Sequence, residues 1–501
     1  MNYLSSPRFW LLAALLVLPF TITNDSLWLD EGDTAVKYVA QPDFQSWWAA
    51  IHHDGGSDSE MPLGDFCFWA ASRVLGNAEW QMRSLNILWG ALALVAMALA
   101  ARRLRLAWLP LLFVIQPFFW FYLDQARPYA LQTALGAWLF FAFVEFITAK
   151  ATGTLWAWTL AVAGFGLFCA TMLAPLSIFA IVLAGTWAAW RRGWNPARKA
   201  VVILLGGALA CVPVGLYYLG TLLRGAKGSQ VWQVDWKTFG YVFYELTGQL
   251  GLGLPADEIR TLARSPHFAG MVVAHFGQFF LPLLGAALLL AVLVLGLNRH
   301  RLKDESGIVS GLILVLVVAT GEFFAVSLFL EKAFWARHYA PVFAFYVALI
   351  GLAAASLWRS TRPWQQVLPA VLCGLLLLSA LNLRFAPQWH KEDYRAAARF
   401  GKSALAAGKS VWWLAGGYPA TYYGLPYSLH HPEPGKAFIA YSTWTNLQDL
   451  PRPDVVIINK PDIHDPGGAV EKLIGDAHYQ VGTRYQNFVI WLKPTTRSAS
   501  P

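Results

Sequence analysis

The stretch from Phe9 to Glu31 reads FWLLAALLVLPFTITNDSLWLDE, an apolar run that leads into an acidic pair. The part from Phe9 to Trp28 is long enough to cross a bilayer as a helix. Some fifty residues of polar and aromatic loop follow before the chain re-enters the membrane at Ser84. An Asp-Glu pair at a membrane edge is costly to hold ionised, so Asp30-Glu31 is a candidate functional site.

The composition excludes an ordinary soluble globular protein, because 57% of the 501 residues are hydrophobic and only 13% are charged. Apolar runs recur as far as Leu383, and polar residues become common after Arg384. We therefore expect a transmembrane domain over residues 1–384 and a soluble α/β domain over residues 385–501. The first run lacks a small-residue cleavage site and is predicted to be a retained helix. Four cysteines, three of them in apolar runs, provide no disulfide framework.

Hydropathy predicts a polytopic α-helical protein with about eleven spans. The fifth and sixth spans divide one uncharged stretch, with a turn expected at Met172–Pro175. The predicted spans cover residues 9–28, 84–101, 106–123, 128–147, 154–171, 174–190, 199–219, 274–297, 307–330, 337–358 and 365–384.

Basic residues occupy every second connection between these spans, which explains the net charge of +9 as a sign of topology. The pattern predicts a cytoplasmic N-terminus. An odd number of spans then places the first loop and the C-terminal domain outside the cytoplasm. The basic connections contain Arg102 to Arg105, Lys150, Arg191 to Lys199, Arg299 to Lys303, and Arg359 with Arg362.

The first outer loop, residues 29–83, is predicted to hold two interfacial helices, at Thr34–Ile51 and Pro62–Val74. The tail shows a pattern of alternating helices and strands, which indicates a small α/β fold. Helices are expected at Glu392–Ala407 and Val470–Gly475, and strands at Ser410–Leu414, Ala437–Tyr441, Asp454–Asn459 and Phe488–Leu492. The tail histidines His430, His431 and His464 are predicted to lie at the surface.

The acidic pair suggests acid–base chemistry. Asp30 could accept the proton of an attacking hydroxyl group while Glu31 holds the acceptor or the base in place. The alternative is a solvated pair that only marks the end of a helix.

A second polar group, Asp124-Gln125-Ala126-Arg127-Pro128-Tyr129, lies at the same outer edge. Arg127 could bind a lipid-linked phosphate, with Asp124 as a further acid, or Arg127 could extend toward headgroups. The same two interpretations apply to Arg337 and His338, which open the tenth span, and to the weaker candidates Arg83 and Lys37. Tyr129 is grouped with these donor phosphate-binding candidates.

The run from His52 to Glu60 contains ligand types suited to a divalent metal, namely His52, His53 and Asp54. Their spacing matches no defined site, and a substrate-facing loop is the favoured interpretation. No cofactor is expected to be required.

In their order and their shared side of the membrane, these segments resemble the GT-C membrane glycosyltransferases, especially bacterial relatives of the protein O-mannosyltransferases and of the lipid A aminoarabinose transferases. The matching features are Asp30-Glu31, Met61-Pro62-Leu63 followed by Gly76 and Arg83, the Asp124–Tyr129 segment, and Arg337-His338-Tyr339-Ala340-Pro341. The His52–Glu60 insertion departs from the pattern.

The resemblance implies an inverting hexosyl or pentosyl transferase of the bacterial inner membrane. Its donor would be a polyprenyl-phosphate monosaccharide, and its acceptor a lipid, glycan or protein of the cell envelope. Asp30 would be the general base, and Arg127 and Arg337 would face the leaving phosphate.

Two other classes remain open from the sequence. A transporter or lipid flippase would place ionisable groups near the middle of the membrane, as Glu322 in the ninth span does, but such proteins usually show internal repeats. A glycan ligase or polymerase would share the chemistry and differ in donor size. Nucleic-acid binding is not expected.

Overall fold

The computed structural model divides the chain into two compact units, which are described one at a time. The helical unit comprises Met1–Thr23 and Asp43–Trp389, and the α/β unit comprises Asn24–Pro42 and His390–Pro501. Residues 24–42, which cover the end of the first predicted span and the start of the first loop, therefore belong with the tail. The boundary expected at residue 384 did not anticipate this pairing. The described residues are 6–53, 61–148, 153–191, 193, 197–223, 236–255, 258–259, 262, 270, 273–301, 307–330, 334–440 and 447–494.

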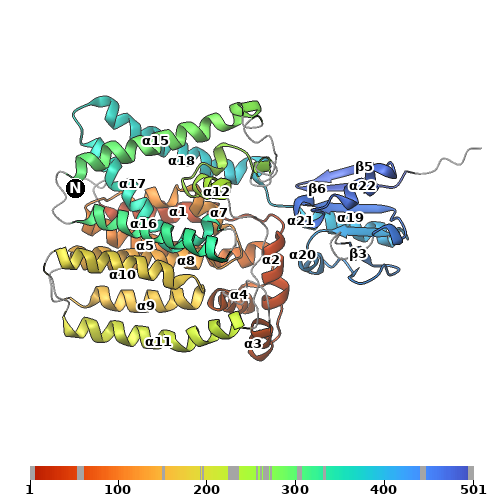
Figure 1. Ribbon diagram of the computed structural model, residues 1–501, viewed down its shortest axis with the longest axis horizontal. Helices are drawn as coiled ribbons and strands as arrows, with labels where there is room; N and C mark the ends of the chain where they lie inside the picture. The colour runs from red at the N-terminus through yellow and green to blue at the C-terminus, as the bar shows by residue number, and fades with distance from the viewer. Residues whose placement is uncertain are drawn as a thin grey trace, which may run out of the picture. The chain divides into compact units, whose positions relative to one another are not determined.

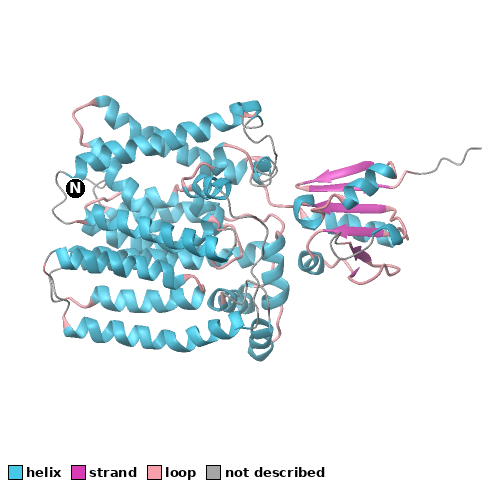
Figure 2. Ribbon diagram, in the orientation of Figure 1, coloured by secondary structure: helices cyan, strands magenta, loops and turns pink. Residues whose placement is uncertain are grey.

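The helical unit is built of helices joined by loops (Figure 2). Each of the eleven predicted spans contains a helical segment. In chain order these are α1 (Pro7–Val17) with η2 (Leu18–Thr21), α5 (Glu79–Leu104), α6 (Leu109–Val114) with α7 (Pro117–Leu123), α8 (Tyr129–Thr148), α9 (Leu155–Ala170), α10 (Ala174–Arg191), α11 (Arg198–Leu223), α15 (Phe276–Arg301), α16 (Ile308–Leu330), η6 (Ala336–Val342) with α17 (Phe343–Trp358), and α18 (Pro363–Phe385). The shorter helices of this unit include α3 (Phe44–His53), α4 (Pro62–Leu75), α12 (Trp236–Leu246), η5 (Leu250–Leu252) and η7 (Pro387–Trp389).

Within the described residues, eight helices are long and apolar enough to cross a membrane, and two shorter apolar helices cover Pro7–Thr21 and Leu155–Ala170. Eight of the eleven predicted spans thus coincide with helices of this length. The segment predicted at residues 106–123 is two short helices, because Pro117 has no backbone N–H to continue a helix and Gln116 adopts an extended conformation. The chain is a multi-pass helical membrane protein.

Helix α8 lies in the middle of the helical unit and packs against α5, α9, η6 and α17 (Figure 1). The contact with η6 is close: a Cβ atom built on Gly136 would lie 2.2 Å from the Pro341 carbonyl oxygen, so only glycine fits there. Helix α11 is mostly exposed and presents Leu205, Leu209 and Leu216 outward, as expected for a helix that faces lipid.

The α/β unit contains one mixed sheet with the strand order β2-β3-β1-β4-β6-β5. Four neighbouring strands are parallel, and β6 and β5 complete the sheet in antiparallel orientation. The strands are β1 (Val411–Leu414), β2 (Tyr427–Ser428), β3 (Ala437–Ile439), β4 (Val455–Asn459), β5 (Gln480–Tyr485) and β6 (Phe488–Leu492). The other elements are α2 (Leu29–Asp33), the π-helix η3 (Thr34–Val39), α19 (Tyr394–Ala406), α20 (Gly417–Tyr422), η8 (Leu447–Asp449), α21 (Pro461–His464) and α22 (Ala469–Asp476).

Two hydrophobic cores cover the two faces of this sheet. One core joins α19 to the side chains of Val411, Trp413 and Ile457, and the other joins α22 to the side chains of Trp412 and Val456. Because both faces are covered, β1 and β4 are buried along their whole length, as is usual for parallel strands.

The predicted tail helices and all four predicted strands are present, which confirms the α/β fold of the tail. The prediction missed β2 and β5. It was wrong for His464, which is buried, and burial lowers the pKa of His464 to about 4. The expected interfacial helix at Thr34–Ile51 is two segments, η3 and α3, separated near Pro42.

Candidate functional site

The predicted site residues fall into two groups, one in each compact unit. The α/β unit contains Asp30, Glu31 and Lys37, and the helical unit contains Arg83, Asp124, Arg127, Tyr129, Arg337 and His338. Each group is described by its own contacts.

In the α/β unit, the two acidic residues occupy the first turn of α2 and have different surroundings. Glu31 is 0% exposed: its Oε2 accepts from the Trp28 backbone N–H at 3.2 Å, and its Oε1 accepts from Lys391 Nζ at 3.1 Å. Asp30 is only half-buried. Both Glu31 carboxylate oxygens thus accept hydrogen bonds inside the α/β unit, while the neighbouring Asp30 can still be reached from solvent.

Lys37, predicted as a phosphate ligand, lies on η3. Its Nζ is 3.5 Å from an Asp33 carboxylate oxygen and 4.8 Å from the centre of the Tyr418 ring. The ion pair with Asp33 and the packing on Tyr418 are enough to explain where the Lys37 side chain lies in the α/β unit. Phosphate binding by Lys37 stays a prediction.

In the helical unit, Asp124 ties the α7–α8 turn to the end of the first span. Its Oδ1 accepts from the Thr23 backbone N–H at 2.6 Å, and its Oδ2 accepts from Thr23 Oγ1 at 3.0 Å. Arg83, which is 0% exposed, donates to the Thr23 carbonyl at 3.2 Å, and its Nε is 4.0 Å from Asp124 Oδ1. Asn86 donates to the carbonyl oxygens of Leu123 and Gln125 at 2.8 and 2.6 Å.

This network gives Asp124 and Arg83 a positioning role, since they hold the turn that carries Arg127. Burying charges is tolerated when each is paired and hydrogen-bonded, as these are. Their predicted contacts with acceptor and donor stay predictions.

The start of α8 gathers positive charge and aromatic side chains. Arg127 is buried in the turn two residues before Tyr129, and the Arg337 guanidinium lies 5.6 Å from the centre of the Tyr129 ring. The Tyr122 ring packs edge-on against Tyr129 with centroids 5.3 Å apart. The N-terminal end of a long helix also carries partial positive charge, so this region is suited to an anion.

His338 has a structural contact beside Arg337. Its Nδ1 accepts from the Trp335 backbone N–H at 3.0 Å, which caps the start of η6, and its ring stacks on Phe334 with centroids 4.9 Å apart. A ring nitrogen that accepts a hydrogen bond carries no proton, so the imidazole is neutral in this geometry. Its predicted phosphate contact stays a prediction.

Sequence reasoning missed Glu245, which belongs to the same region. The Tyr122 hydroxyl donates to its Oε1, and the side chain is 4% exposed on α12. Burial raises the pKa of Glu245 to about 7, although Tyr122 and the positive charge of Arg337 act in the opposite direction. The sequence feature that could have identified Glu245 is its position as a single acidic residue between Tyr244 and Leu246, among apolar and aromatic neighbours.

We expect Glu245→Gln to change how stability depends on pH. Because the folded pKa of about 7 lies above the ordinary value of 4.5, the wild-type protein loses stability as pH rises from about 4.5 to about 7. The shift corresponds to about 3 kcal/mol of unfolding free energy. Gln keeps an acceptor for Tyr122 and does not ionise, so the variant should gain thermal stability over wild type at pH 8 and little at pH 5. A difference in melting temperature that is constant between these pH values would contradict the assignment.

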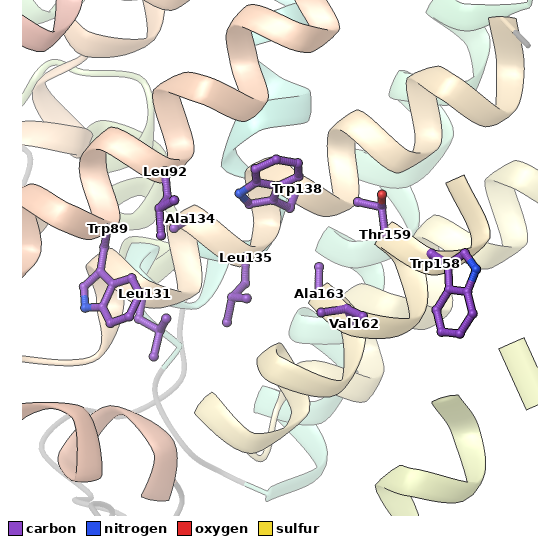
Figure 3. Close-up of a pocket in the computed structure, with 10 residues that line it drawn as sticks. All are labelled: Trp89, Leu92, Leu131, Ala134, Leu135, Trp138, Trp158, Thr159, Val162 and Ala163. Carbon is purple, nitrogen blue, oxygen red and sulfur yellow. The ribbon is translucent and has the colours of Figure 1, made fainter. Parts of the chain in front are cut away.

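An apolar groove of about 430 Å³ begins near the start of α8 (Figure 3). Leu131, two residues after Tyr129, lies at one end of its lining and Trp158 on α9 lies at the other (Figure 3). Its walls come from three helices: Trp89 and Leu92 from α5; Leu131, Ala134, Leu135 and Trp138 from α8; Trp158, Thr159, Val162 and Ala163 from α9. Nine of its ten lining side chains are apolar or aromatic, and Thr159 is the exception, so the polarity of the groove suits a hydrocarbon chain.

The metal prediction is only partly covered by the structure. His52 lies on α3 and its ring stacks on Trp48 with centroids 6.1 Å apart, whereas Asp54 and the run to Glu60 lie outside the described residues. Among the described residues no three His, Cys, Asp or Glu side chains form a group suited to a metal.

Comparison with known proteins gives matches at the level of structure. No family model and no curated protein sequence matches the chain. The crystal structure of ArnT from Cupriavidus metallidurans in the apo state is similar with a TM-score of 0.51 and 12% identity, over 97% of each chain.

Two further solved structures match with lower TM-scores of 0.41. One is the same ArnT bound to undecaprenyl phosphate, at 13% identity over 99% of each chain. The other is the arabinofuranosyltransferase AftD from Mycobacteria, at 12% identity over 98% of this chain and 40% of AftD. The similarity to the apo ArnT structure concerns the fold. The chain therefore has the same fold as this ArnT structure over 97% of each chain.

Proposed function

We propose that this protein is a membrane glycosyltransferase that moves a monosaccharide from a polyprenyl-phosphate donor to a lipid, glycan or protein acceptor at the outer face of the bacterial inner membrane. The observation that carries the proposal is that two environments lie close together on α8. Arg127, Arg337 and Tyr129 gather at its first turn, and an apolar groove on another face of the helix starts at Leu131. A lipid phosphate has this combination of an anionic head and a hydrocarbon tail.

The proposed reaction is an inverting displacement. The acceptor oxygen bonds to the anomeric carbon, and the bond from that carbon to the phosphate oxygen breaks with its electron pair staying on the phosphate. Asp30 takes the proton of the acceptor hydroxyl. The leaving phosphate gains negative charge, which Arg127 and Arg337 stabilise from fixed positions.

The proposal assigns these roles to both units. The base belongs to the α/β unit and the cations belong to the helical unit. Asp30 is preferred over Glu31 as base because Glu31 already accepts hydrogen bonds from Lys391 and Trp28. Two arginines can offset the phosphate charge without a metal. The orientation, with a cytoplasmic N-terminus, rests on the basic connections.

Filling the groove should weaken use of long-chain donors. Val162 lines the groove and is 67% exposed, so Val162→Trp fills it with little disturbance of packing. Losing contact with two CH₂ groups would raise the donor KM by about tenfold. The assay compares transfer from a long polyprenyl-phosphate sugar with transfer from a short-chain analogue, whose KM should not change.

The matched control is Val202→Trp on α11, where the valine is 61% exposed and lies outside the groove lining. Equal effects of both tryptophans, or equal effects on long and short donors, would remove the groove from donor binding. Failure of the wild-type protein to transfer sugar from any polyprenyl-phosphate donor would contradict the proposed function itself.

A further inference from the structure

The backbone just before Asp30 is fixed by side chains from the C-terminal part of the α/β unit. The Leu27 backbone N–H and the Ser26 hydroxyl both donate to the Tyr423 hydroxyl oxygen, at 2.7 and 3.0 Å. Arg395 donates from its backbone N–H to Ser26 Oγ at 3.1 Å and from its guanidinium to the Asn24 carbonyl at 2.9 Å. These bonds join residues almost four hundred positions apart in the sequence.

The α2 helix itself lies over the carboxyl ends of the parallel strands. A Cβ built on Gly416, which follows β1, would be 2.3 Å from Leu29 Cδ1. The Lys460 ammonium, just after β4, lies 5.2 Å from the centre of the Trp28 ring. In open α/β sheets this edge is the usual place for a ligand. In this protein the α2 helix is the element that lies at this edge of the sheet.

Two ion pairs with little exposure complete the contact. Glu31 pairs with Lys391, whose side chain is 14% exposed. The next residue, Glu392, pairs with Lys460 and accepts from Asn459 Nδ2 at 2.8 Å. Removing one partner of a buried pair leaves an uncompensated charge, which costs more than the pair contributes. The position of α2 therefore depends on Lys391, the partner of Glu31.

We propose that the α/β unit is a positioning platform for Asp30, and that Lys391 acts as a positioning residue by anchoring the neighbouring Glu31. The inference rests on the proposed role of Asp30 as base. It gives the C-terminal domain a specific task, which is to hold the first-loop carboxylate rather than to bind the acceptor.

Hydrogen–deuterium exchange of the full-length protein tests the anchoring without reference to activity. Lys391→Met should speed exchange of residues 27–33 by about tenfold, because the buried Glu31 carboxylate loses its partner. The double variant Glu31→Gln with Lys391→Met removes the unpaired charge and should restore slow exchange, and Lys391→Arg should behave as wild type. Lys436→Met is the matched control, since Lys436 pairs with Glu433 at the surface of the same unit.

Kinetics then test positioning. In Lys391→Met we expect kcat to fall at least tenfold with the donor KM unchanged, and Lys391→Arg to restore kcat. If Lys391→Met left the exchange rate of residues 27–33 unchanged, the proposal that the α/β unit positions Asp30 would be overturned. This would hold even if Asp30→Asn were inactive. Full transfer by Asp30→Asn would overturn the proposed base, while faster exchange in Lys391→Met would still support the anchoring.

Discussion

Asp30→Asn should lower kcat for sugar transfer by on the order of a thousandfold, the usual contribution of a positioned general base. Asn keeps the size of the side chain and cannot take the acceptor proton. Asp30 is half-buried in the first turn of α2, where an amide also fits, so expression and the fold should not change. The donor KM should stay close to the wild-type value, because the proposed phosphate ligands are Arg127 and Arg337.

The matched control is Asp33→Asn, three residues along the same helix. Asp33 pairs with Lys37 and has no proposed chemical role, so its variant should retain most of the activity. Equal losses in both variants would indicate damage to α2 rather than loss of a base. Undiminished transfer by Asp30→Asn would exclude Asp30 and make Asp124 the next carboxylate to test.

Arg337→Met should lower kcat/KM by roughly a hundredfold to a thousandfold, the range found when one preorganised charge-stabilising donor is removed. The loss should appear in kcat as well as in donor KM, because the negative charge on phosphate grows as the sugar departs. Arg337→Lys should recover part of the loss, since an ammonium keeps the charge but cannot place a planar fork against the Tyr129 ring.

The control for Arg337 is Arg102→Met, which removes an exposed arginine from a connection on the proposed cytoplasmic side. Steady-state kinetics with the same donor should show no change for this variant. Wild-type kcat/KM in Arg337→Met would exclude Arg337 from the phosphate site and favour a headgroup contact for this side chain.

The helices could be predicted from the sequence because hydropathy is a local property. Each predicted span contains helix, and the helix at residues 106–123 is interrupted where Pro117 overrides hydropathy. The tail strands were predictable for the same reason, since runs such as VVIIN at Val455–Asn459 are apolar throughout.

The arrangement of the site was less predictable because it depends on distant residues. Glu245 acquires its environment from Tyr122, 123 positions earlier, and nothing in the segment around Glu245 indicates that partner. Ser26 and Leu27 meet Tyr423 across almost the whole chain, so the membership of residues 24–42 in the α/β unit could not be inferred from composition. Asp124 and Arg83 were identified as polar residues at one edge, but their mutual contact with Thr23 is visible only in three dimensions.

The most direct measurement uses purified protein in vesicles, a panel of polyprenyl-phosphate monosaccharides labelled in the sugar, and an envelope extract as acceptor. The account predicts that one donor passes its label to an acceptor, that unlabelled polyprenyl phosphate is released, and that Asp30→Asn abolishes both. Absence of transfer with every donor, together with movement of the intact labelled lipid across the vesicle membrane, would contradict the account and favour a lipid flippase.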